Sequence, residues 1–339
     1  MTRRTRDERG FMLVVALVFV LLLTASIVTF QRRAMLDWMI AHHRDAAAEA
    51  EAAARGAVRL GITLLLEDRL EETTSGFKSE TLDDVWARAS GIDLPAQDGV
   101  QLRLKIEDAG ARLNLNALLD KGHPRKYSEL FLTNVLDQVI QDVPNRAHAR
   151  SYDSSKLARN LLDYISDDPV GIEGGPKDEP YQRRKPPGHA ASRPLLSVEE
   201  LRLVEGFDGD LVEALRPYVT VYPYAKADGI NPNTAPPHVL GLIFHGVASN
   251  FQLATEAEVK SVLKSRDQGN VLCADSAKTP GCQSIGELLP GEIFPPPTFA
   301  SNVFTIRAEA KVGEVRRTVE AVVDRSKPSA PQLLAWRVE

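Results

Sequence analysis

The sequence lacks the short motifs that mark most enzyme active sites. Its 339 residues contain no Gly-x-Ser-x-Gly turn and no phosphate-binding glycine loop. None of its seven histidines forms a pair with helical metal-ligand spacing around a glutamate. We therefore predict that the chain is not an enzyme and assign no catalytic residue. A membrane-anchored hydrolase with an unrecognised site is the alternative.

Cysteine is also scarce, with only Cys273 and Cys282 in the whole chain. No further cysteine and no nearby histidine accompanies them, which disfavours a metal site. If this part of the protein is exported to an oxidising space, the two are expected to form a disulfide. Two free thiols are the alternative.

Charge is absent from one stretch, the twenty residues Phe11–Phe30. A helix of this length spans about 30 Å, enough to cross the hydrocarbon core of a bilayer. The preceding residues include Arg3, Arg4, Arg6 and Arg9, which favours a cytoplasmic N-terminus. No small-x-small cleavage motif follows the run, as it would in an ordinary secretory signal. The suggested cut lies before the run, between Gly10 and Phe11; a plain N-terminal anchor is the alternative.

Excess positive charge is lacking too, since the net charge is −5. An acidic chain is a poor nucleic-acid binder. The segment LRLVEGFDGDLVEAL nevertheless looks like a helix-hairpin-helix element, so a membrane-anchored periplasmic DNA-binding or uptake protein is an alternative function. Its turn carries Glu205, Asp208 and Asp210, which would repel phosphate. A packing or docking module is therefore favoured.

The periodicity of apolar residues predicts an α+β body behind the anchor. Good helix formers continue the anchor helix through Gln31–Leu70. Alternation over Val100–Ile106 predicts a strand, and alternation over Asn302–Lys311 and Glu314–Asp324 predicts a hairpin. Helical spacing predicts helices between these strands, over Lys126–Gln141, Ser154–Ile165, Val198–Leu215, Pro237–His245 and Glu256–Arg266. Helices are therefore expected to be inserted into a small antiparallel sheet.

An acidic loop follows the second of these helices and is a candidate metal site. Six carboxylates fall within seventeen residues, interleaved with glycines: Asp163, Asp167, Asp168, Glu173, Asp178 and Glu179. Calcium takes six to eight oxygen ligands, and glycines allow backbone carbonyls to turn inward beside the carboxylates. The spacing is not that of an EF-hand. A solvated acidic loop is the alternative reading.

Four segments together resemble a known family. The junction at Gly10 and Phe11 resembles the class III signal of type IV pilins and type II secretion pseudopilins. Three further segments, EDAGARLNLNAL, RPLLSVEELRLVEGFDGDLVEALRPYVTVYP and GINPNTAPPHVL, resemble blocks of the type II secretion system minor pseudopilin of the protein K family. They cover nearly the whole chain in the same order.

The resemblance implies a pilin-like fold, with a long N-terminal helix packed on a small antiparallel sheet and a large α-helical domain inserted. The implied division is a cleaved leader at 1–10, a transmembrane half of the helix at 11–30 and a periplasmic half at 31–70. The first part of the pilin-like domain then covers 71–118, the inserted domain with the acidic loop covers 119–217, and the rest of the body covers 218–339. This last part is expected to hold a second helical hairpin, the cysteine loop and the C-terminal β-hairpin.

The resemblance also implies a function. It implies a subunit at the tip of the type II secretion pseudopilus that starts and caps the filament, so that folded proteins are exported across the outer membrane. Implied partners are other minor pseudopilins, the major pseudopilin, the prepilin peptidase and the inner-membrane assembly platform, with no nucleic acid. The implied location is the bacterial inner membrane, with a single pass, a cytoplasmic N-terminus and a periplasmic body.

Particular residues acquire expected roles from the same resemblance. The peptidase would cut after Gly10 and Phe11 would be N-methylated. Val15 stands where ordinary pseudopilins have a glutamate, which the protein K family typically lacks. The family also implies calcium in the inserted body and a disulfide late in the chain. Ser166 stands where an acid is common, so the individual calcium ligands stay open.

Overall fold

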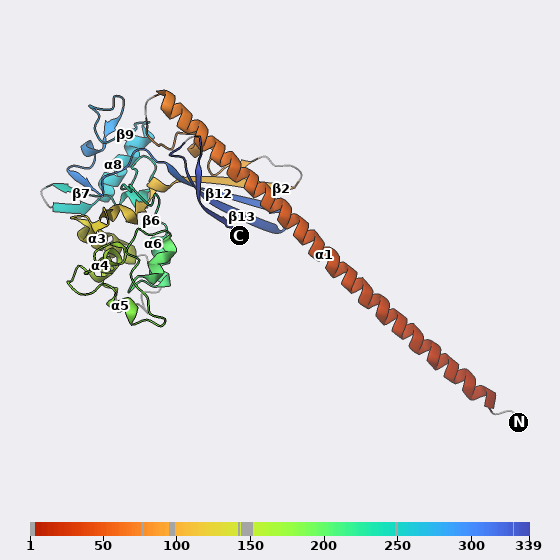
Figure 1. Ribbon diagram of the computed structural model, residues 1–339. Helices are drawn as coiled ribbons and strands as arrows, with labels where there is room; N and C mark the ends of the chain where they lie inside the picture. The colour runs from red at the N-terminus through yellow and green to blue at the C-terminus, as the bar shows by residue number, and fades with distance from the viewer. Residues whose placement is uncertain are drawn as a thin grey trace.

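The computed structural model of the chain describes residues 4–75, 78–94, 99–141, 143, 152–247, 250–327 and 329–339. One helix, α1 (Arg4–Ser75), contains 72 residues, which corresponds to about 108 Å at 1.5 Å per residue. Figure 1 shows its first half projecting away from the rest of the molecule, while its second half lies along a sheet. The predicted continuation of the anchor into the body is confirmed. Met1–Arg3, the start of the expected leader, lie outside the described residues.

The second half of α1 packs on the sheet through a stripe of small side chains. The stripe comprises Ala46, Ala50, Ala54, Ala57 and Val58, all buried. Gly61 continues it, and a β-carbon there would lie only 3.0 Å from a methyl group of Ile306. Small residues at spacings of three and four place a continuous groove along one helix face, so the helix axis lies close to the strands.

The sheet has five antiparallel strands in the order β1-β2-β12-β13-β14. Their bounds are Asp93–Leu94, Val100–Asp108, Val303–Val312, Val315–Asp324 and Gln332–Val338. The predicted strands and the C-terminal hairpin are therefore confirmed. One face of the sheet buries Leu104, Ile106, Phe304, Ile306 and Val319 against α1, together with Trp86 of the short helix α2 (Val85–Arg88). The period of two explains this sidedness, because alternate side chains point to opposite faces.

Everything between β2 and β12 forms the inserted region. Its helices are α3 (Ser128–Ile140), α4 (Ser154–Ile165), α5 (Glu179–Gln182), α6 (Gly209–Leu215), α7 (Pro237–Leu240) and α8 (Glu256–Asp267). Its 3-10 turns are η1 (Ala109–Ala111), η2 (Leu115–Leu118), η4 (Val198–Leu203) and η5 (Ile285–Glu287). Its short strands are β3 (Leu113–Asn114), β4 (Leu119–Asp120), β5 (His123–Pro124), β6 (Val219–Thr220), β7 (Phe244–Val247), β8 (Asn250–Leu253), β9 (Leu272–Cys273), β10 (Gln283–Ser284) and β11 (Glu292–Phe294).

One hydrophobic core unites this region from Leu113 to Phe294. Its centre is a set of contacting aromatic rings, among them Phe131, Phe244 and Phe294. The expected boundary at residue 217 falls inside this core, and β3 pairs with β6 across it. In Figure 1 the region lies beside the end of the sheet that is remote from the N-terminus.

Two local predictions were wrong. The helix expected over Pro237–His245 is a single turn, α7, after which the chain enters β7; an antiparallel sheet in the order β11-β7-β8 stands where a second helical hairpin was expected. The helix α7 ends at Leu240 with Gly241 as its C-cap, and the run Leu242–Phe244 that follows contains residues that favour strands. The helix expected from Val198 is the 3-10 turn η4, and Ser197 before it makes no capping hydrogen bond with its side chain. Glu200 instead pairs with Arg193 at 3.1 Å.

Candidate functional site

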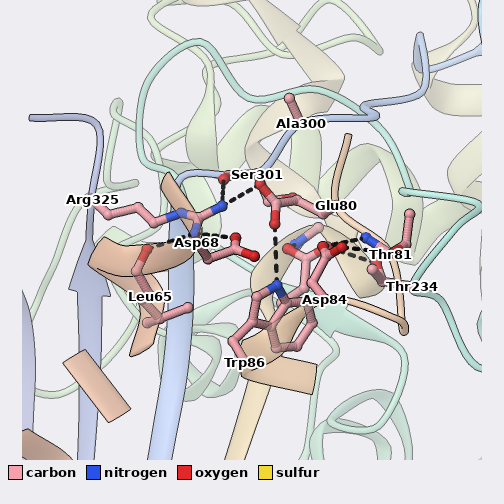
Figure 2. Close-up of polar contacts among 12 residues, drawn as sticks. Leu65, Asp68, Glu80, Thr81, Asp84, Trp86, Thr234, Ala300, Ser301 and Arg325 are labelled. Atoms are coloured by element: carbon pink, nitrogen blue, oxygen red, sulfur yellow. Dashed lines mark hydrogen bonds and ion pairs between the residues drawn. The ribbon is translucent and has the colours of Figure 1, made fainter. Parts of the chain in front are cut away.

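A buried ion cluster joins α1, the segment before α2 and the end of β13. Arg325, which is 0% exposed, donates from Nη1 to the Leu65 carbonyl at 2.8 Å and to Asp68 Oδ2 at 2.7 Å. Its Nη2 donates to Glu80 Oε1. Figure 2 shows the guanidinium lying between these two carboxylates. Three segments that are far apart in sequence are thereby fixed to one cation.

Aromatic rings enclose the same cluster. The indole Nε1 of Trp86 donates to Glu80 Oε2 at 3.3 Å, and the Arg325 guanidinium lies 4.5 Å from the centroid of Phe304. Asp68, Glu80 and Asp84 bring ligand atoms within 4.8 Å of one another. Because Arg325 already supplies positive charge there, the cluster is an internal ion network that holds the hairpin on the helix.

Two of the family-like segments meet at a second buried carboxylate, Asp108. Its Oδ1 accepts from the Gly110 amide at 2.7 Å, and its Oδ2 accepts from Asn231 Nδ2 at 3.1 Å and Thr234 Oγ1 at 2.6 Å. Burial raises the pKa of Asp108, and the hydrogen bonds from Thr234, Gly110 and Asn231 partly offset that rise. Asp108 therefore joins the end of β2 to the Ile-Asn-Pro-Asn-Thr segment of the inserted region.

The asparagines of the Leu-Asn-Leu-Asn segment bind the remaining family-like block. Asn114 Nδ2 donates to the Pro223 carbonyl at 2.9 Å. Asn116 Nδ2 donates to the carbonyls of Leu195 and Val221, and its Oδ1 accepts from the Leu195 amide at 2.8 Å. An amide side chain suits this position because it offers donors and an acceptor to extended backbone. The segments that resemble the family are thus mutually bonded in space.

The cysteine loop is attached to the same framework. Cys273 and Cys282 form the predicted disulfide, with their Cα atoms 5.9 Å apart. Asn233 holds the adjacent residue, accepting from the Leu272 amide at 2.8 Å and donating to its carbonyl at 2.9 Å. The third family-like segment therefore also positions this loop.

Three of the six acidic-loop residues share one hollow. Asp163, Glu173 and Glu179 line a recess of about 170 Å³, whose lining also includes Lys177 and Glu205. Asp163 Oδ1 accepts from the Ile172 amide at 2.9 Å, and burial raises the pKa of Asp163. Glu173 pairs with Arg159 at 2.8 Å, and Glu179 pairs with Arg183.

The other three carboxylates of the predicted set, Asp167, Asp168 and Asp178, do not line this hollow. Asp168 pairs with His123 Nδ1 at 2.9 Å, and the Asp167 amide donates to the Gly122 carbonyl, so both face the β4–β5 turn. Asp178 accepts from the Ala190 amide at 2.8 Å and contacts His189. Among the described residues, no three carboxylates of this loop bring ligand atoms within 4.8 Å of one another. The structure thus divides the predicted set of six between separate places.

The processing junction lies within α1. Gly10 and Phe11 are both exposed, and Phe11 begins the uncharged run. By length and hydropathy, α1 is the helix of the described chain that could cross a membrane, and its most apolar window has no residue buried against the body. The body therefore leaves this part of the helix available for lipid or for other helices.

The helix-hairpin-helix-like segment has a different geometry from its predicted one. It consists of the 3-10 turn η4 and the short helix α6, joined through Gly206 at φ +89°. Glu205 pairs with Arg184 at 2.8 Å, and Asp208 Oδ1 accepts from the Leu211 amide at 3.0 Å. Carboxylates thus occupy the turn, where a phosphate-binding hairpin would present unoccupied amides.

Known proteins are similar to this chain in sequence. A family model described as "Type II secretion system (T2SS), protein K" matches residues 111–224. The "Putative type II secretion system protein K" of Escherichia coli K12 is 24% identical over 274 residues, covering 80% of this chain and 78% of its own. The type II secretion system protein K of Klebsiella pneumoniae is 28% identical over 243 residues, covering 70% and 69%.

A solved structure shares the fold. A chain from the crystal structure of the GspK-GspI-GspJ complex of the enterotoxigenic Escherichia coli type 2 secretion system matches with a TM-score of 0.60 at 19% identity. The match covers 88% of this chain and 99% of the other. The predicted α+β fold, with a long helix on an antiparallel sheet and an inserted region, is confirmed, although the insertion is mixed rather than wholly helical. In sequence and in fold, the chain is therefore similar to the type II secretion system protein K family.

Proposed function

We propose that this protein is the minor pseudopilin at the tip of the type II secretion pseudopilus, where it starts and caps the filament that exports folded proteins. The observation that carries the proposal is the insertion between β2 and β12, which adds a second core to a pilin-like scaffold. It lies at the end of the sheet remote from the N-terminus of α1 (Figure 1). A subunit widened in this way leaves no room for another subunit to stack above it.

The uncharged run supports the same assignment. Val15 provides no carboxylate for the charged amino terminus of a neighbouring subunit, and burying that amino group unpaired would cost several kcal/mol. A terminal subunit has no neighbour on its far side that makes this demand. The expected processing is a cut between Gly10 and Phe11 by the prepilin peptidase, with methylation of Phe11.

The proposed setting follows from this role. α1 crosses the bacterial inner membrane once with its N-terminus in the cytoplasm, and the body lies in the periplasm. The partners are minor pseudopilins of the GspI and GspJ kinds, with which a relative of this fold was crystallised, the major pseudopilin and the inner-membrane assembly platform.

Deletion of the chromosomal gene and complementation with an epitope-bearing copy test the proposal. Secretion should be lost on deletion, and gold-labelled antibody should mark filament ends alone. Mass spectrometry of the membrane form should show a chain that starts at Phe11 with one added methyl group. Label along the whole filament, or secretion that survives deletion, would refute the tip assignment.

We also propose calcium in the hollow lined by Asp163, Glu173 and Glu179. The donor set fits, since carboxylates beside glycine backbone are ligands that calcium prefers. Burial raises the pKa of Asp163, and a bound cation would stabilise the charged form of this carboxylate. Bound calcium would neutralise these carboxylates and hold the loop against α4 and α5. Their pairing with Arg159 and Arg183 would be exchanged for the ion.

Thermal unfolding with and without a chelator tests this site. At a hundredfold excess of calcium over its Kd the ion would add about 2.7 kcal/mol of stability, so the chelator should lower the Tm. Asp163→Asn should abolish that difference. Glu256→Gln, at an exposed residue paired with Lys260, should keep it. A Tm that is the same with and without chelator would exclude the ion.

A further inference from the structure

β14 is an open edge of the main sheet. In the part of the chain that the structure describes, β13 pairs with it on one side and no strand lies on its other side. An edge strand presents unpaired backbone groups, which natural proteins commonly protect with short strands, prolines or charges. β14 has seven residues, QLLAWRV, with Arg337 as its single charge and no proline. It is thus a weakly protected edge.

Hydrogen bonding within the sheet fixes which backbone groups face outward. Thr318 and Glu339 exchange two backbone hydrogen bonds, each 2.9 Å long. In an antiparallel ladder, hydrogen-bonded and non-hydrogen-bonded pairs alternate. The pairs Val319–Val338 and Ala321–Trp336 are therefore non-hydrogen-bonded, and the N–H and C=O groups of Trp336 and Val338 point toward the open edge.

The same residues carry an apolar shelf beside α1. Directly paired residues share one face of a sheet, and Val319, Ala321 and Val323 face the core under α1. Their partners Val338, Trp336 and Leu333 thus lie on the α1 side of the sheet, where they are 38%, 40% and 53% exposed. We call these three side chains the edge shelf.

The other face of the edge borders a groove. A recess of about 790 Å³ lies between β14 and the inserted region, and its lining includes Leu196, Tyr222, Tyr224, Leu334 and Ala335. A strand added to β14 would direct alternate side chains to the edge shelf and into this groove. An α-helix laid on the shelf would leave the outward N–H and C=O groups of β14 without backbone partners.

We propose that β14 accepts a β-strand from a neighbouring minor pseudopilin, which extends the five-stranded sheet across the subunit boundary. The inference rests on the proposed function for the identity of its partner, and the edge itself specifies the partner's chemistry as extended polypeptide with apolar side chains on alternate positions. Backbone hydrogen bonds would supply the register, and the edge shelf would supply the apolar contact.

The test uses the full chain in detergent with the GspI-type and GspJ-type pseudopilins of the same organism. Complex formation is measured first, by size exclusion with light scattering. Hydrogen exchange followed by mass spectrometry then reports on the peptide that spans 332–339. Amides of this peptide should exchange at least about tenfold more slowly in the complex, because the outward N–H groups become bonded.

Two variants at one position separate the backbone from the side chain. Val338→Pro removes an outward N–H and leaves the bonds to β13, a placement that edge strands tolerate. It should weaken the complex by about tenfold or more. Val338→Ala keeps the N–H and should stay within about threefold of the parent.

The outcomes are distinguishable. If no complex forms with the parent chain, the proposed partnership fails and this inference fails with it. If the complex forms but the peptide gains no protection, strand addition is refuted while the proposed function stands. A Val338→Pro variant that binds as tightly as Val338→Ala would refute it equally. Should Val338→Pro fail to fold, hydrogen exchange of the parent complex still decides the matter.

Discussion

Replacement of Arg325 by methionine should destabilise the body severely. Methionine keeps an apolar stem of similar length but removes the cation that bonds Asp68 and Glu80. Arg325 and Glu80 are both fully buried, so two carboxylates would lose their compensating charge in a site that water does not reach. Breaking one partner of a buried ion pair costs about 3–5 kcal/mol. That range corresponds to about 6–20 °C in Tm at 2–4 °C per kcal/mol.

Urea unfolding followed by tryptophan fluorescence measures this loss. Trp86 bonds to Glu80 within the cluster, so a Trp38→Phe and Trp336→Phe background makes it the sole reporter. The control is Arg316→Met, since Arg316 and Glu309 form a pair that is 62% and 35% exposed; such a pair contributes about 0–1 kcal/mol.

A second substitution tests the cause. Glu80→Gln in the Arg325→Met background removes one of the two carboxylate charges left without a cation. The double variant should therefore be more stable than the sum of the single effects predicts. A loss below about 1 kcal/mol for Arg325→Met, or strict additivity in the double variant, would refute the assignment of the cluster as the lock between helix and hairpin.

Two further predictions concern buried polar residues, Asp108 at the end of β2 and Asn116 in the inserted region. Because burial raises the pKa of Asp108, the native state holds its proton more tightly than the unfolded state, so this residue's contribution to stability declines as pH rises from about 3.8 toward the folded pKa. Asp108→Asn should remove that slope in denaturation measured from pH 4 to 7; an unchanged slope would contradict it. Asn116→Ala leaves backbone groups of Leu195 and Val221 without their hydrogen-bond partner. It should lower the free energy of unfolding by about 3 kcal/mol. Asn134→Ala, on an exposed face of α3, should cost less than about 0.5 kcal/mol in the same assay.

Elements with a long regular period could be predicted from the sequence. α1, α4 and the β12–β13 hairpin combine consistent apolar spacing with favourable residues, so local propensity and tertiary packing agree there. The region around α7 could not be assigned, because a short apolar run such as Val239–Phe244 is compatible with helix and strand alike. Pairing with β8 and β11 decided its structure, and those contacts lie outside any local window.

The candidate site residues also fall into two groups, those that a local sequence pattern predicts and those that only the fold reveals. Gly10, Phe11 and the cysteine pair stand out as local patterns, and the asparagines of the family-like segments do too, although their bonding to one another is visible only in three dimensions. Arg325 has no local signal at all. Its carboxylate partners are 257 and 245 residues away along the chain, so only the fold reveals that this arginine is buried and paired.

The long stretch of chain between α1 and the C-terminal hairpin, which Arg325 bridges, has a consequence for how the protein folds. The sheet cannot be completed until β12 and β13 reach β2, and the entropy of closing a chain grows with the length of the loop between the paired segments. An insertion with its own core can fold first and bring the two ends of that loop close together. Folding is therefore expected to begin in the inserted region and to finish with the C-terminal hairpin, so that α1 gains its cover only after β12 and β13 have paired with β2.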